Sequence, residues 1–82
     1  MVKLHVVGFP PRFGEIELLE LFSHHVTVDE LYLATDRYTG KRLGYAFVLL
    51  RDTVSANRAI QVFNGIWIER SRMRVRLAIN NG

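Results

Sequence analysis

The chain has 82 residues, which is enough for one hydrophobic core and therefore for a single domain. Its 49% hydrophobic and 23% charged residues exclude a disordered chain, and no apolar run approaches the roughly 20 residues that span a bilayer. The absence of cysteine excludes disulfides, thiolate zinc sites and cysteine nucleophiles. The net charge of +3 comes from residues 66–82, where four arginines face one glutamate; this excess suits a polyanionic partner, with solubility as the alternative.

Hydrophobic periodicity predicts an alternation of strands and helices along the whole chain. The polar loop 36–42 has the turn residues of a hairpin, Asp52 or Thr53 can cap a helix, and Asn64-Gly65 can end it. In the last strand Met73, Val75 and Leu77 are expected to point inward, and Arg72, Arg74 and Arg76 outward. The predicted elements are a strand at 2–7, a helix at 15–24, a strand at 30–34, a strand at 43–50, a helix after residue 53 and a strand at 72–77.

This order of elements places both predicted helices on one side of a four-stranded sheet, because crossover connections are right-handed. The opposite face of the sheet is then open to solvent. The strand pleat puts a set of aromatic and basic residues on that face: His5, Tyr32, Tyr45, Phe47, Arg74 and Arg76. Exposed aromatic rings flanked by arginines are difficult to explain as packing. The alternative for the rings is that the tail or a second copy of the chain covers them. The alternative for the arginines is a solvated strand face.

On these residues the sequence resembles the RNA recognition motif family over nearly its whole length. Residues 4–9 resemble the family's hexapeptide motif and residues 43–50 its octapeptide. Further segments match in register: 19–23, 35–40, 59–60 and 64–65. The resemblance implies an α+β, ferredoxin-like βαββαβ sandwich with antiparallel strand order 4-1-3-2. The expected domain is 1–82, with a core at 2–78 and a short tail at 79–82.

The resemblance also implies a site. Tyr45 and Phe47 occupy the octapeptide's stacking positions, and His5 occupies the hexapeptide's. The other expected RNA-binding residues are Tyr32 and Lys3 at base edges and Arg42, Arg74 and Arg76 at phosphates. Leu43 and Gly8 depart from the motifs, which usually have a basic residue and an asparagine at these positions. We therefore expect non-catalytic, micromolar binding of single-stranded RNA, weaker binding of single-stranded DNA, and no cofactor.

A protein-interaction module is the alternative function. Trp67, Ile16, Leu19, Val54 and Val62 are apolar at positions that the pattern leaves outside, so they are either scattered surface residues or a protein-binding patch on the helical side. The Arg-x-Phe loop that some family members use to bind peptides is absent at 66–70.

Catalysis and metal binding have little support in the sequence. Arg12 lies in a loop where acylphosphatases of the same fold use an arginine, but no nucleophile is paired with a base. His24 and His25 are adjacent at a helix end and lack a third ligand. The start of the chain reads as a strand without a signal segment, so we expect an intracellular, cytoplasmic monomer, or a nuclear one if the source is eukaryotic.

Overall fold

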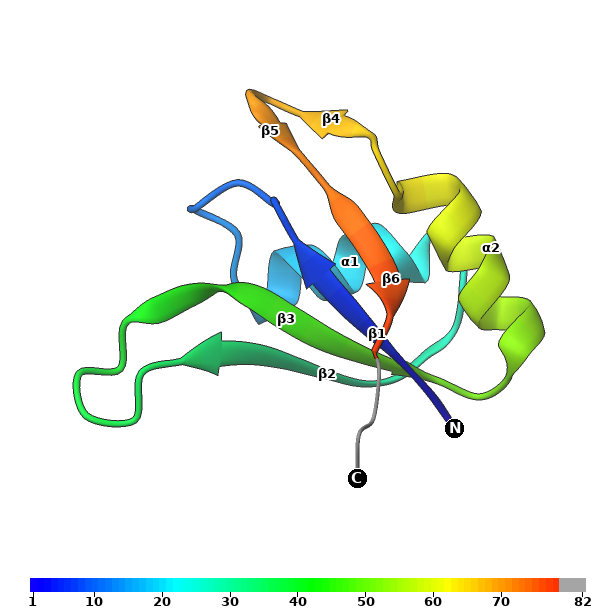
Figure 1. Ribbon diagram of the computed structural model, residues 1–82, viewed down its shortest axis with the longest axis horizontal. Helices are drawn as coiled ribbons and strands as arrows, with labels where there is room; N and C mark the ends of the chain where they lie inside the picture. Colours follow the sequence, from blue (N-terminus) through cyan, green and yellow to red (C-terminus); the bar gives the residue numbers. More distant parts are fainter. Residues whose placement is uncertain (79–82) are drawn as a thin grey trace.

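The computed structural model describes residues 1–78, and the predicted tail, 79–82, lies outside the described residues. Figure 1 shows how the elements are arranged. In chain order they are β1 (Val2–Val7), α1 (Glu15–Ser23), β2 (Val28–Thr35), β3 (Arg42–Leu50), α2 (Thr53–Phe63), β4 (Trp67–Ile68), β5 (Ser71–Arg72) and β6 (Arg74–Leu77). Neither helix within residues 1–78 has the length and apolar character needed to cross a membrane.

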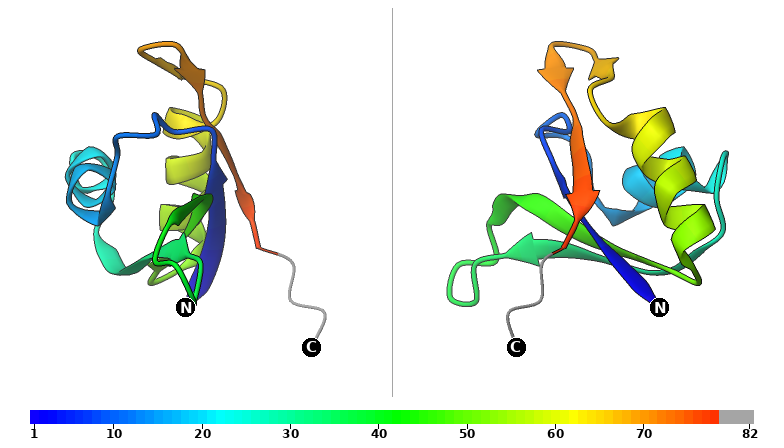
Figure 2. Two further views of the ribbon diagram at one scale, coloured as in Figure 1. Left: turned by 90° about the vertical axis from the view of Figure 1, so that its left-hand side faces the viewer. Right: turned by 45° about the vertical axis from the view of Figure 1, so that its right-hand side comes forward.

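The main sheet is antiparallel and has the order β2-β3-β1-β6. Helices α1 and α2 pack on one face of this sheet, and within residues 1–78 the other face carries no helix (Figure 2). The order is the predicted 4-1-3-2, with β6 as the fourth principal strand, so the ferredoxin-like α+β fold is confirmed. The two motif-bearing strands, β1 and β3, lie side by side in the middle of the sheet.

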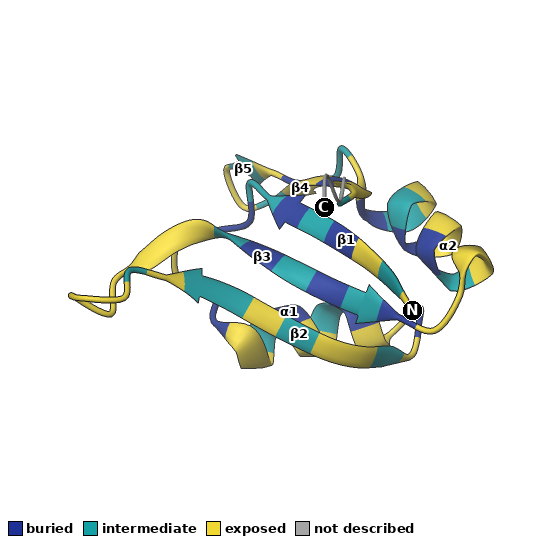
Figure 3. Ribbon diagram, turned by 60° about the horizontal axis from the view of Figure 1, so that its bottom comes forward, coloured by how far each residue is buried: buried dark blue, intermediate teal, exposed yellow. Residues whose placement is uncertain are grey.

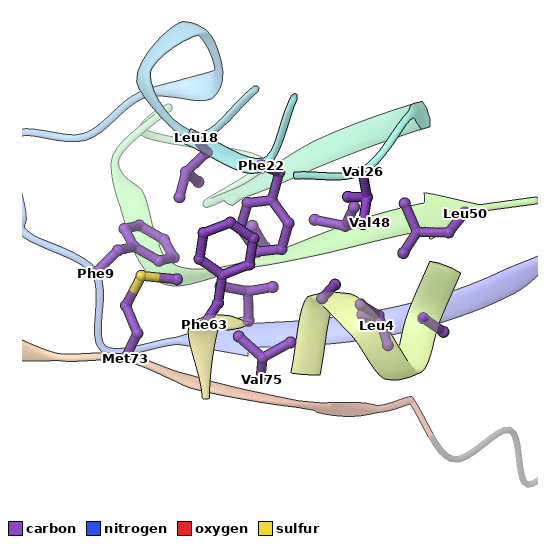
Figure 4. Packing of buried hydrophobic residues seen from close by; sticks show 14 of the residues in the cluster. Leu4, Phe9, Leu18, Phe22, Val26, Val48, Leu50, Phe63, Met73 and Val75 are labelled. Atoms are coloured by element: carbon purple, nitrogen blue, oxygen red, sulfur yellow. The ribbon is translucent and has the colours of Figure 1, made fainter. Parts of the chain in front are cut away.

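The hydrophobic core lies between the sheet and the helices (Figure 4). Alternate residues of the central strands, such as Leu4, Val6 and Val48, are fully buried. The rings of Phe22 in α1 and Phe63 in α2 are 4.4 Å apart between centroids, which joins the two helices above the sheet. Within residues 1–78 no polar or charged residue is buried, so the core is held by apolar packing.

Local hydrogen bonds explain where the helices begin. The Asp52 carboxylate accepts the backbone N–H of Ser55 at 2.9 Å, which confirms the predicted cap of α2. At α1 the cap is Gly14, whose N–H donates to the Glu17 carboxylate at 2.7 Å. These bonds lower the pKa of both Asp52 and Glu17, because a backbone N–H stabilises the ionised carboxylate.

The chain between α2 and β6 differs from the prediction. The sequence predicts Arg72 on the outward face of the last strand, but the structure places it in a short hairpin, β4–β5, opposite Trp67. There its Nε donates to the carbonyl of Gly65 at 3.1 Å. Leu77, predicted to point inward, is 51% exposed because it ends the edge strand β6. Val62, predicted outside, is partly buried against the core.

Candidate nucleic-acid interface

The strand register aligns the predicted site residues in a row across the open face. Tyr32 on β2 lies opposite Phe47 on β3, Phe47 lies opposite His5 on β1, and His5 lies opposite Arg76 on β6. Figure 3 shows the alternation that produces this row, with buried residues along β1 and β3 separated by partly exposed ones. Three ring-bearing residues and one arginine are therefore presented together.

A second row lies next to the first. Tyr45 on β3 is opposite Val7 on β1, which is in turn opposite Arg74 on β6. On the other side of the first row, Lys3 pairs with Leu49. Lys3 thus lies on one side of the first row and Arg74 on the other, on the face that the strand pleat predicts for both.

The three rings on the central strands form one cluster. Ring centroids are 5.2 Å apart for His5 and Phe47, 5.5 Å for His5 and Tyr45, and 5.8 Å for Tyr45 and Phe47. The planes are inclined by 36°, 59° and 84°, respectively, so no ring lies flat against another. Each of these three side chains keeps part of its surface accessible to a ligand.

The charged groups on this face suit an anion. Lys3, Arg74 and Arg76 are exposed. The ion pair found within residues 1–78 does not involve them, because it joins Arg12 to Glu69. The Lys3 ammonium lies 4.7 Å from the centroid of the Phe47 ring, an arrangement that a cation–π attraction favours. The three cations are therefore not neutralised by carboxylates in the described part of the chain.

Tyr32 at the edge of the face is in a different electrostatic setting. Its hydroxyl donates a hydrogen bond to the Glu30 carboxylate. This bond, together with the nearby negative charge, raises the pKa of Tyr32, because both disfavour the phenolate. The Tyr32 hydroxyl therefore stays protonated and remains bonded to Glu30, which lies on the same strand.

The structure does not bring Arg42 to the rings. Arg42 begins β3, and its Nη1 donates to the backbone carbonyls of Pro11, Arg12 and Phe13, each at 3.3 Å. The Arg42 side chain also lines a pocket together with the first turn of α1, so it lies on the helical side of the sheet and away from the rings. The guanidinium holds the β1–α1 loop in place.

Gly8 has a structural role that the sequence analysis missed. Its φ is +79°, and a Cβ added there lies 2.0 Å from the carbonyl oxygen of Arg72. Only glycine allows the hairpin backbone to pack so closely on the end of β1. Arg12 supports the same contact, because its Nε donates to the Glu69 carboxylate at 2.8 Å. A glycine directly after a strand is the sequence signal for such an approach.

The surplus apolar residues do not share one surface. Ile16 and Leu19 lie together in a groove between α1 and β2 that includes neither Val54 on α2 nor Trp67 on the hairpin. Trp67 is 66% exposed, and the guanidinium carbon of Arg72 lies 5.9 Å from its ring centroid.

A metal-binding cluster is not found in the described part of the chain. No group of three or more histidine, aspartate or glutamate side chains comes together within residues 1–78. The His25 ring instead packs edge-on against Phe63, with 5.5 Å between the ring centroids.

Comparisons with known proteins agree with this geometry. The model of the RNA recognition motif family matches residues 4–74. RNA-binding protein 38 of Xenopus tropicalis is 37% identical over 76 residues, which cover 93% of this chain and 34% of that protein. The chain thus spans about a third of the length of this curated relative.

Solved structures give the same result. The Sxl-lethal protein in its complex with RNA is 32% identical, with a TM-score of 0.91 over 99% of this chain and 48% of that one. The Rna15 RRM with bound RNA (GU) is 26% identical, with a TM-score of 0.83 over 98% of this chain and 85% of that one. Since the family model covers most of the sequence and the fold, strand order and motif strands agree with it, the chain belongs to the RNA recognition motif family.

Proposed function

We propose that this domain binds single-stranded RNA on the open face of its sheet, without a catalytic step. The observation that supports this most directly is the cluster of His5, Tyr45 and Phe47, whose ring centroids are 5.2 to 5.8 Å apart on a face that no described helix covers. Unpaired bases stack on such rings, at roughly 1 to 3 kcal/mol per base. Two structural neighbours contain RNA, which agrees with the proposal.

The binding mode follows from the position of each group. Bases stack on the rings of the central strands, and the Lys3 ammonium leaves the face of Phe47 to make room and pairs with a phosphate. Arg76, opposite His5, and Arg74, in the row of Tyr45, attract further phosphates along the β6 side. A single strand is required because the bases of a duplex are already stacked on one another.

Two further parts of the site modify this mode. Tyr32 extends the row at the β2 edge, where its ring is exposed to a base and its hydroxyl oxygen can accept a hydrogen bond while the proton is held by Glu30. Arg42 acts indirectly by holding the β1–α1 loop. Stacking does not need the 2′-hydroxyl, so single-stranded DNA binds as well, more weakly than RNA where that hydroxyl is contacted.

Chemical-shift mapping with a random-sequence, eight-nucleotide RNA pool tests this proposal. We expect amide shifts in β1, β3 and β6 and almost none in α1 or on the outer surface of α2. The double variant Tyr45→Ala/Phe47→Ala should remove most of the binding and stay folded, because both rings lie outside the core. If the folded double variant binds the pool as tightly as the parent, stacking on these rings is not the mode of binding.

A further inference from the structure

A groove runs along the sheet edge, on the side away from the aromatic cluster. Its lining comes from α1 and β2, and its volume is about 260 Å³. Figure 3 shows α1 running beneath β2 at this edge. Ile16 and Leu19, which are three residues apart and so share one face of α1, are 69% and 44% exposed there. The lining residues are Glu15, Ile16, Leu19, Val28, Asp29, Glu30 and Leu31.

The strand that borders the groove has an open edge. β2 is the outermost strand of the sheet, and the backbone N–H of Leu33 points away from β3, since it donates to the Glu15 carboxylate at 3.4 Å. Leu31, two residues earlier, directs its N–H the same way. The pairing with β3 is regular from Glu30 to Leu33 and irregular on either side. β2 also lacks the lysine or proline that commonly protects an edge strand.

The charge of the groove is opposite to that of the RNA-binding face. Its three charged lining residues, Glu15, Asp29 and Glu30, are all acidic. Within residues 1–78 none of them forms an ion pair, although the whole chain has a net charge of +3. Such a site repels phosphates and attracts lysine and arginine, so it is not an extension of the RNA-binding face.

We propose that this groove binds an extended segment of a partner protein in which lysine or arginine alternates with aliphatic residues. The segment adds as a strand to the outer edge of β2, where it pairs with the backbone of Leu31 and takes the place of the Glu15 carboxylate at the N–H of Leu33. Its aliphatic side chains then face the helical side and pack on Ile16 and Leu19. Its basic side chains face the open side, where Glu30 lies beside Tyr32.

A second copy of this chain is the competing occupant. Strand β6, at the opposite edge of the sheet, carries the pattern Arg74-Val75-Arg76-Leu77. Val75 is only 1% exposed, however, because it belongs to the core of its own copy. A copy can therefore offer its arginines but not the aliphatic side chain between them, so a separate partner segment fits the groove better.

The test uses a synthetic peptide, acetyl-Lys-Ile-Arg-Val-Lys-Leu-Arg-amide, titrated into the full chain without RNA. We expect saturable amide shifts at Ile16, Leu19, Leu31 and Leu33. Hydrogen exchange at the Leu31 and Leu33 amides should slow, which is the signature of strand addition. A control peptide with glutamate at each basic position should not bind.

Two substitutions locate the peptide. Asp29→Lys should weaken binding by at least about ten-fold, because it replaces an attractive charge in the groove by one that repels the basic peptide. Val54→Ser alters an exposed apolar residue on α2 outside the groove, and it should leave the affinity unchanged. Circular dichroism establishes that both variants are folded.

Three results would overturn the proposal. The first is equal binding of the acidic peptide, and the second is unchanged hydrogen exchange at Leu31 and Leu33 in the saturated complex. The third is the same pattern of shifts on raising the concentration of the chain alone, which would assign the groove to a second copy.

Discussion

Phe47 has a central place among the groups proposed to bind RNA. Its ring centroid lies 5.2 Å from that of His5 and 5.8 Å from that of Tyr45. The Lys3 ammonium nitrogen lies 4.7 Å from the same centroid. Replacing Phe47 by alanine removes one stacking platform, which is worth roughly 1 to 3 kcal/mol. This loss corresponds to an increase in Kd of about 5- to 150-fold.

Two matched variants separate stacking from other effects. Phe47→Tyr keeps the aromatic ring and should stay within about three-fold of the parent, which is less than the loss of one stacked base. Phe47→Leu keeps apolar bulk without a π face, so it should bind almost as weakly as the alanine variant. All three should remain folded, because the neighbouring Ala46 and Val48, both 0% exposed, anchor β3 in the core.

Fluorescence anisotropy with the eight-nucleotide RNA pool, at one fixed salt concentration, measures these affinities. Thermal unfolding of each variant shows whether the fold is intact. A folded Phe47→Leu protein with the affinity of the parent would refute the stacking argument, since shape and hydrophobicity would then be sufficient. An unfolded alanine variant would mean that the ring belongs to the core.

Further variants test other parts of the structure. Gly8→Ala should lower the free energy of unfolding by about 1 to 3 kcal/mol through backbone strain alone, and the clash with the Arg72 carbonyl adds to this loss. Chemical denaturation measures the total. Asp52→Ala should lower Tm at neutral pH. Because the Ser55 N–H lowers the pKa of Asp52, this difference from the parent should shrink as the pH falls below about 3.9. Arg76→Gln should reduce the slope of log Kd against log salt by about 0.7, and an unchanged slope would exclude its phosphate contact.

The parts of the fold with clear periodicity could be predicted from the sequence. Alternation in residues 2–7 and 43–50 put His5, Tyr45 and Phe47 on one face, so their neighbouring positions followed from the strand order. The strand order itself came from the family resemblance, because local patterns do not show which strands are neighbours.

The remaining features depend on contacts between distant segments. Strands β4 and β5 are too short to give a periodic signal, so Arg72 was assigned to the wrong strand. Alternation gives the side of the sheet on which Leu77 lies, but not whether anything covers it at the end of an edge strand. The contacts of Arg42 span about 30 residues of sequence, and no local pattern predicts such a partner.

Glu30 marks the limit of the cationic face, and neutralising it should strengthen RNA binding. Its carboxylate accepts the Tyr32 hydroxyl at the end of the aromatic row, so it repels any phosphate that follows a base onto Tyr32. For a phosphate about 10 Å away in water, this repulsion is worth about two-fold in Kd.

Glu30→Gln should therefore bind the RNA pool about two-fold more tightly at low salt, a gain that screening removes at high salt. The substitution should also lower the pKa of Tyr32 toward its ordinary value, because the bond to a charged acceptor and the adjacent negative charge are both lost. Ultraviolet titration of the phenol measures that change independently of RNA. If the pKa of Tyr32 falls as expected but RNA affinity decreases, the carboxylate positions the Tyr32 ring for a base, and that contribution outweighs the repulsion of the phosphate.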